Sequence, residues 1–171
     1  MGNMKFDMSD LNEKGYIIIQ AGRYPGKLTE WVAYKKEETG NTVNALTFEI
    51  FDGEYEGQNI RHFVVVEPGH LMRSKQRMFR TLVALGVIKP EDRSGEDGLT
   101  VSSIVDEVND DKQDVITSFE VNGEKRKVIG CPVTLVVVED TNQDGDPTHK
   151  IRHLEDISAL GESVKDDDIP F

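Results

Sequence analysis

The first third of the chain alternates apolar and polar residues with a period of two, and this pattern restricts the segment to β-structure. The alternation covers residues 26–34 (GKLTEWVAY), 44–51 (NALTFEIF) and 59–66 (NIRHFVVV). Successive side chains of a strand point to opposite faces, so one face of each segment is expected to be buried. The polar stretches 35–42 and 52–58, which separate the three alternating segments, are typical of turns. The sequence therefore predicts three consecutive antiparallel strands.

The period changes to that of a helix at about residue 71. Apolar residues recur with a spacing near 3.6 as far as Leu85. Pro68 and Gly69 precede this segment and Gly86 ends it, which are typical helix boundaries. We predict one amphipathic helix over about 71–85.

Residues 91–128 carry weaker signals. The stretch 100–110 can be a short helix or part of a small subdomain, and 118–130 is typical of a hairpin with Asn122 and Gly123 at its tip. Two clear strands follow, at 130–140 and 149–157. Because three strands, a helix, an insertion and two strands follow one another, we predict an all-β fold with one helix, specifically a five-stranded OB-fold Greek-key barrel with 91–128 inserted before strand 4.

Charge divides the chain into a body and a tail. The net charge is −12, made up of −1 over residues 1–92 (12 bases, 13 acids), −4 over 93–128 (5 bases, 9 acids) and −7 over 129–171 (3 bases, 10 acids). A strongly acidic chain opposes binding to phosphate, but the nearly neutral first part can carry a basic face. From about Ser158 the core periodicity stops, so we predict a globular domain over 1–157 and a disordered acidic tail over 158–171.

Several classes of function are disfavoured by what the sequence lacks. It has no run of 18 apolar residues and no apolar secretory core at the start, so we expect a cytoplasmic protein without a membrane partner. The single cysteine, Cys131, rules out a disulfide framework. The stretch 140–148 begins like a calcium loop, yet its twelfth position is Ile151 rather than glutamate, so a hairpin loop is expected. With no catalytic motif, we predict a non-enzyme with no cofactor and no metal.

The C-terminal sequence KDDDIPF gives the most specific signal. Its last six residues are similar to the acidic tip of bacterial single-stranded-DNA-binding proteins. The body resembles instead a family of phage-encoded proteins of replication and recombination gene clusters, taken to be single-stranded-DNA-binding proteins with an OB-fold. The matching segments are FDMSDLNEKGYIIIQAGRY, TGNTVNALTFEIFDGEYEGQNI, the basic helix ending LVALG, and VIGCPVTLVVVED with KIRHLEDI.

This resemblance implies a protein of the host cytoplasm that coats transient single strands and recruits replication or recombination enzymes through its tail. An acidic run ahead of an apolar end can enter a basic-rimmed apolar pocket of a partner, with the terminal carboxylate paired to a cation. The residues predicted to bind such a partner are Asp166, Asp167, Asp168, Ile169, Pro170 and Phe171.

Sequence-independent binding of a single strand requires aromatic faces for bases and cations for phosphates. The working surface of an OB-fold lies on strands 2 and 3 and the adjoining loops. If Leu46, Phe48 and Ile50 point inward, Phe51 points outward; Arg61 and Phe63 are the outward pair of the next strand. Strict alternation places Trp31 on the face opposite Leu28, Val32 and Tyr34. The candidate nucleic-acid-binding residues are Trp31, Tyr34, Lys35, Lys36, Phe51, Tyr55, Arg61, Phe63, Arg73 and Arg77.

Each candidate has a structural alternative: the aromatic residues can belong to the core, and the cations can be solvated loop or helix residues. Two other functions also fit the sequence. One is a strand-annealing accessory protein on the same fold. The other is an acidic interaction protein, such as a DNA mimic or a competitor for host factors, that uses the tip without binding DNA. The choice between DNA and RNA and the presence of a homo-oligomer stay open.

Overall fold

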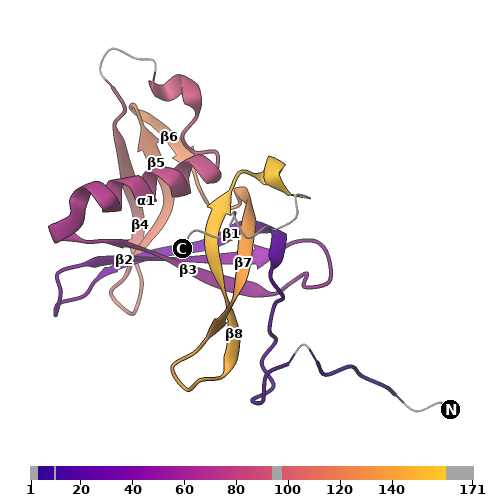
Figure 1. Ribbon diagram of the computed structural model, residues 1–171. Coiled ribbons are helices and arrows are strands. Elements are labelled where there is room, and N and C mark those ends of the chain that lie inside the picture. Colours follow the sequence, from indigo (N-terminus) through magenta and orange to yellow (C-terminus); the bar gives the residue numbers. More distant parts are fainter. Residues whose placement is uncertain (1–3, 10, 94–97, 161–171) are drawn as a thin grey trace.

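The computed structural model describes residues 4–9, 11–93 and 98–160 (Figure 1). They form eight β-strands and one α-helix, which confirms the prediction of an all-β fold with one helix. The strands are β1 (Gly22–Lys35), β2 (Thr42–Ile50), β3 (Asn59–Val66), β4 (Val101–Val108), β5 (Asp114–Val121), β6 (Glu124–Lys127), β7 (Pro132–Thr141) and β8 (Pro147–Glu155). The helix α1 (Leu71–Ala84) lies between the short 3-10 turns η1 (Pro68–His70) and η2 (Pro90–Arg93), and a third turn, η3 (Ile157–Ala159), follows β8.

Strand β1 organises the sheet because its two halves have different neighbours. Every pairing is antiparallel, and the path runs β3-β2-β1-β5-β4, with β6 on β5 and the β7–β8 hairpin on β1. The first half of β1 pairs with β7, and its second half pairs with β5. Strands β3 and β8 lie side by side, but no strand pairing joins them within the described residues, so the sheet is not closed there.

A β-bulge in β1 changes which side chains face the core. The pairing of β1 with β2 shifts between Leu28 and Glu30, so one extra residue stands on β1. As a result Leu28, Trp31 and Ala33 all belong to the core cluster, although strict alternation puts Leu28 opposite Trp31. The prediction of which β1 side chains share a face is therefore wrong for residues on opposite sides of the bulge.

The core fills the space between the concave inner face of the sheet and α1. Leu46, Phe48 and Ile50 of β2 are fully buried, as predicted. The ring of Trp31 packs on that of Phe119, with the ring centroids 4.9 Å apart. The fully buried apolar side chains of this core include Ile19, Leu28, Leu82, Leu135, Val121, Val128 and Val133.

The segment 91–128 extends the sheet. The stretch predicted as a short helix or a subdomain is strand β4, so the helical reading is wrong: it pairs with β5 along its length. The predicted hairpin with Asn122 and Gly123 at its tip is confirmed, since it joins β5 to β6 and both residues have positive φ (50° and 84°). The sheet as a whole therefore has eight strands, three of which come from the segment predicted as an insertion.

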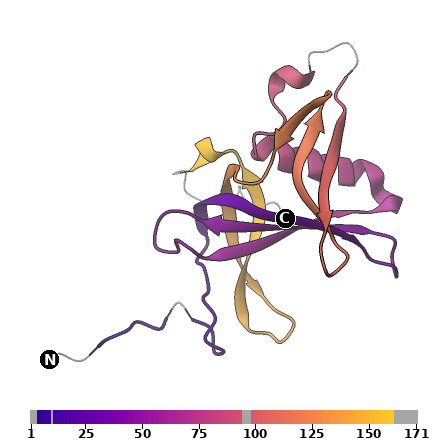
Figure 2. The ribbon, with the colours of Figure 1, turned by 180° about the vertical axis from the view of Figure 1, so that it is seen from behind.

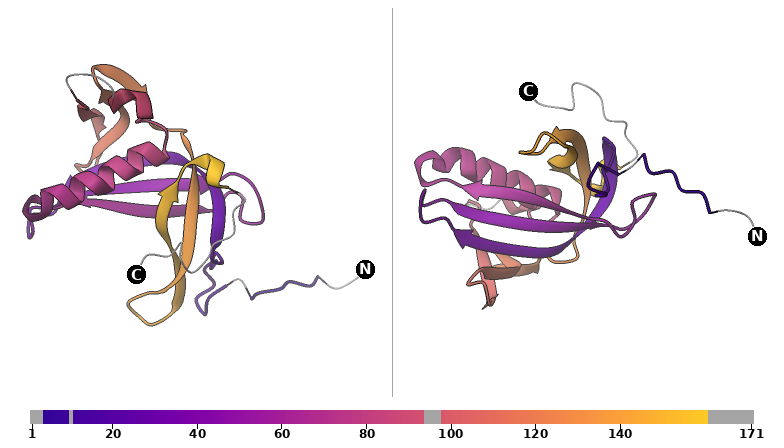
Figure 3. Two further views of the ribbon diagram at one scale, coloured as in Figure 1. Left: turned by 45° about the horizontal axis from the view of Figure 1, so that its top comes forward. Right: turned by 90° about the horizontal axis from the view of Figure 1, so that it is seen from below.

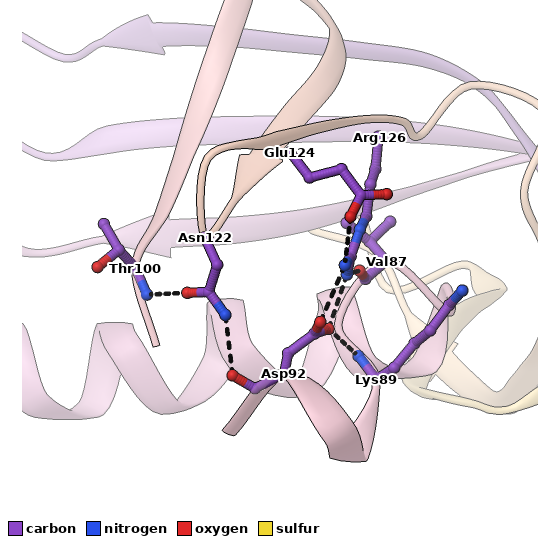
Figure 4. A network of polar contacts seen from close by, with 7 residues as sticks. All are labelled: Val87, Lys89, Asp92, Thr100, Asn122, Glu124 and Arg126. Carbon is purple, nitrogen blue, oxygen red and sulfur yellow. Dashed lines mark hydrogen bonds and ion pairs between the residues drawn. The ribbon is translucent and has the colours of Figure 1, made fainter. Parts of the chain in front are cut away.

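A network of polar contacts fastens the β5–β6 hairpin to the chain that follows α1 (Figure 4). The Arg126 guanidinium donates to both carboxylate oxygens of Asp92, at 2.7 and 2.9 Å, and to the carbonyl of Val87 at 2.7 Å. The Arg126 bonds to the carboxylate, together with a bond from the Lys89 amide at 2.7 Å, lower the pKa of the Asp92 carboxyl to about 2. The Asn122 side chain donates to the Asp92 carbonyl and accepts from the amide of Thr100. The inserted strands are thereby fixed to the body.

The structure also tests the predicted helix, the predicted loop near residue 145 and the first residues of the predicted tail. The helix and the hairpin loop between β7 and β8 lie where the sequence placed them. Of the predicted tail 158–171, the first residues belong to η3 and its end, while 161–171, including the acidic tip, lies outside the described residues. No helix among the described residues is long and apolar enough to cross a membrane.

Candidate nucleic-acid interface

The outer face of β1, β2 and β3, opposite α1, carries three of the predicted residues, Tyr34, Arg61 and Phe63; we call this surface the outer face. Phe51 comes directly after β2, beyond the end of that strand that lies furthest from Tyr34. Viewed from below (Figure 3, right), the three strands are seen face-on and no described helix crosses them. The side chain of Phe63 is 52% exposed, and Arg61 and Phe51 are also exposed. The outer face therefore offers aromatic and cationic groups to solvent.

Strand register sets the order of these side chains. Phe63 stands opposite Ala45 of β2, and Arg61 stands opposite Thr47, one pleat further along β3. Directly paired residues point to the same face, and next-but-one residues of a strand lie about 7 Å apart. Tyr34 stands opposite Val43 at the other end of the same face. The residues between the rings on this face are small and apolar. They are Val32, Val43 and Ala45, and all three are buried.

The outer face carries charges of both signs. Lys27 forms an ion pair with Glu49, with a Nζ–Oε1 distance of 3.6 Å. Glu30 is exposed on the same face, opposite Thr47. Among the described residues, no carboxylate lies within ion-pair distance of Arg61. Arg61 is thus the cation of this face that remains available to an anionic ligand.

Helix α1 presents a second group of cations on the other side of the sheet. Arg73, Lys75, Arg77 and Arg80 are all exposed, and the helix contains no acidic residue. Arg77 pairs with Glu67 at 3.3 Å. Because the core packs between α1 and the sheet, Arg73 and Arg77 do not share a surface with Phe63, as the sequence-based set assumed.

Lys35 and Lys36 lie between the two cationic regions. Lys35 is the last residue of β1, and Lys36 follows it. Lys35 pairs with Thr42 of β2, which also pairs with Val66, the last residue of β3. The chain turns from there through η1 into α1. Both lysines are exposed, so this end of the sheet connects the outer face with the start of the basic helix.

Trp31 and Tyr55 require a correction, because neither can stack on a base in this structure. Trp31 is fully buried on the inner face as a consequence of the β1 bulge, and its indole N–H donates to Asn44 Oδ1 at 2.9 Å. Tyr55 is buried under the β2–β3 turn and meets Tyr24 edge to face, with the ring centroids 5.5 Å apart. Both serve the core.

Lys75 was missed by the sequence analysis, which selected helix residues by the arginine stripe alone. The signal was present, since α1 has four cations and no acids over its 14 residues. Asn44 was also missed as a structural residue. Its position on the inward side of a predicted strand marked it as a buried polar group in need of partners.

Ionisable side chains at the β3–β8 edge serve the fold. His62 of β3 is part-buried, and burial, reinforced by the neighbouring His153, lowers the pKa of His62 to about 4. His153 Nε2 lies 2.8 Å from Glu155 Oε1, and Arg23 pairs with the same oxygen at 3.4 Å. No group of three or more metal-ligating side chains occurs in the part of the chain that the structure describes.

Comparison with protein-family models and with curated proteins finds no match to this chain.

Proposed function

We propose that this protein binds single-stranded DNA without sequence preference through the outer face of β1–β3, as a member of the phage-encoded family that its sequence resembles. The observation that carries the proposal is the half-exposed Phe63 ring beside Arg61, which has no ion-pair partner among the described residues, on a sheet face that no described helix covers. A ring face stacks on any base, and a guanidinium binds phosphate or stacks in turn.

The strand path supports an OB-type barrel as the scaffold. The ring β1-β2-β3 is continued by β8 and β7 back to β1, with only the β3–β8 edge unpaired. Strands β4, β5 and β6 then form an insertion between the helix and the fourth barrel strand. In such a barrel the second and third strands carry the ligand, and here these are β2 and β3.

The cations allow a path for the strand across the molecule. We propose that bases lie over Phe63 and Tyr34, with Arg61 on the phosphates, and that Lys35 and Lys36 lead the chain towards Arg73 at the start of α1. The acidic tip, Asp166 to Phe171, recruits replication or recombination proteins in this proposal. Its support is the sequence alone.

Fluorescence anisotropy of a labelled oligo-dT, measured at several salt concentrations, tests the proposal. Phe63→Ala should weaken binding by about 5- to 150-fold, because stacking contributes about 1–3 kcal/mol per base. Arg61→Gln should reduce the slope of log affinity against log salt by about 0.7, the value for one phosphate contact on a single strand.

Tyr16→Ala is the matched control, because Tyr16 is an exposed aromatic residue outside the outer face. It should leave affinity unchanged. If the wild-type protein produces no anisotropy change at low salt, DNA binding is refuted. The acidic interaction protein, which the net charge of −12 favours, then becomes the better account. Strand-annealing assays with complementary oligonucleotides separate coating from annealing.

A further inference from the structure

Residues 4–9 form an arm that leaves the body of the protein (Figures 1 and 2). Met4, Phe6 and Met8 are 84%, 64% and 59% exposed, and they alternate with the polar Lys5 and Asp7. In an extended chain such alternation puts all three apolar side chains on one face. The hydrogen bonds of the arm are local, such as Ser9 N to Asp7 Oδ1 at 2.9 Å. The arm thus presents an apolar strand face that its own body does not cover.

A groove of about 600 Å³ lies between α1 and the β4–β5 pair, above the inner face of β1 and β2; we call it the α1–β4 groove. Most of its lining is apolar. The residues that matter here are Met78, Phe79 and Leu82 from α1 and Val105, Ile116 and Phe119 from β4 and β5. A groove of this size and composition is suited to a few large apolar side chains.

One wall of the groove ends in an unpaired strand edge. Strand β4 pairs with β5 on one side, and no other described strand pairs with its outer edge. Val105 lines the groove and is 46% exposed. An open edge carries unsatisfied backbone donors and acceptors, which an added strand satisfies.

We infer that the arm of a second copy of this chain adds to the free edge of β4 and places Met4, Phe6 and Met8 over the α1–β4 groove. The alternate side chains of the added strand reach the groove while its backbone pairs with β4. Three observations support this contact: the alternation of apolar residues in the arm, the apolar lining of the groove and the open edge of β4. The contact does not depend on DNA binding.

Charge and geometry favour a second copy over the arm's own body. Lys5 and Asp7 make the arm neutral, and among the described residues the charged members of the groove lining are Lys75 and Asp114, which have opposite signs, so the contact itself adds no like-charge repulsion between copies of net charge −12. The base of the arm is held at the β7–β8 loop, where Lys14 pairs with Asp144. In the view from below (Figure 3, right), the β7–β8 pair and the β4–β5 pair lie on opposite sides of β1–β3.

Sedimentation velocity over a wide concentration range, without DNA, tests the inference. The wild-type chain should associate reversibly. Phe6→Ser on the arm and Val105→Lys on the groove wall should each weaken association about tenfold or more, since each removes apolar burial from the contact. Tyr16→Ser, which removes an exposed aromatic residue outside the arm, should leave association unchanged.

Hydrogen exchange measures the same contact locally, at the arm and at β4. Amides of residues 4–9 and of β4 should both become more protected as protein concentration rises, and Phe6→Ser should shift that rise to about tenfold higher concentration or beyond. A wild-type chain that stays monomeric at all concentrations overturns the inference. So does association that Phe6→Ser and Val105→Lys leave intact, or protection that is independent of concentration.

Discussion

Gly26 sits at the point where β1 is paired on both sides, and replacing it with alanine tests the packing of the β1–β7 seam. It pairs with Ile50 of β2 and with Val133 of β7. A Cβ at this position would lie 2.6 Å from Leu135 Cδ1 and 2.8 Å from its Cγ. Carbon atoms in contact are normally about 3.5–4.0 Å apart, so the overlap is about 1 Å with two atoms.

Leu135 has little room to move away from this overlap. It is fully buried, and its strand is paired with both β1 and β8. Overpacking of this kind costs about 1–3 kcal/mol of unfolding free energy. The substitution would otherwise stabilise by about 0.4–1 kcal/mol, because alanine restricts the unfolded chain more than glycine. The net loss is therefore at most about 2.6 kcal/mol, and we expect Gly26→Ala to lower the melting temperature by up to about 10 °C.

Urea unfolding followed by Trp31 fluorescence measures the effect, because Trp31 is the only tryptophan and is fully buried. Gly69→Ala is the control: a Cβ there meets no atom within 4 Å, so stability should change by less than about 0.5 kcal/mol. In a Leu135→Ala background the clashing atoms are absent, and Gly26→Ala should cost little. An equal cost in both backgrounds, or no cost in either, refutes the packing argument.

Two further substitutions test buried polar groups. Asn44→Ala leaves the Trp31 indole N–H and the Val64 carbonyl without the partners that they have at 2.9 and 3.1 Å, so urea unfolding should show a loss of about 1–3 kcal/mol; a loss below 0.5 kcal/mol would contradict the role assigned to this side chain. Because the pKa of His62 in the folded protein is about 4, below the ordinary value of 6.5, stability should fall as pH falls from about 6.5 towards 4. His62→Gln should make stability between pH 6.5 and 5 less dependent on pH, and an unchanged profile would show that His62 does not contribute.

Much of the fold follows from the periodicity of the sequence. Leu46, Phe48 and Ile50 face the core and Phe63 faces solvent, as alternation predicts, because β2 and β3 pair without a register shift. The helix was equally clear, since its apolar spacing and flanking Gly86 agree. Local signals suffice where local pattern and tertiary packing coincide.

Other features depended on tertiary contacts that the sequence does not display. The bulge in β1 moved Trp31 into the core, and nothing local distinguishes that strand from a regular one. Strand β4 is mostly exposed, so it lacks the apolar alternation of a buried strand, and its pairing with β5 defines it. The predicted nucleic-acid-binding residues lie on two surfaces for the same reason. Arg73 is on α1, which packs on the opposite side of the core from Phe63.

Photo-crosslinking tests the central proposal most directly. An oligo-dT containing 5-iodouracil is irradiated with the full-length protein, and the attached peptides are identified by mass spectrometry. The account predicts attachment at Phe63 or Tyr34 on the outer face, lost at Phe63 in the Phe63→Ala variant. Attachment confined to α1, or none at a protein concentration where anisotropy shows saturation, would contradict it.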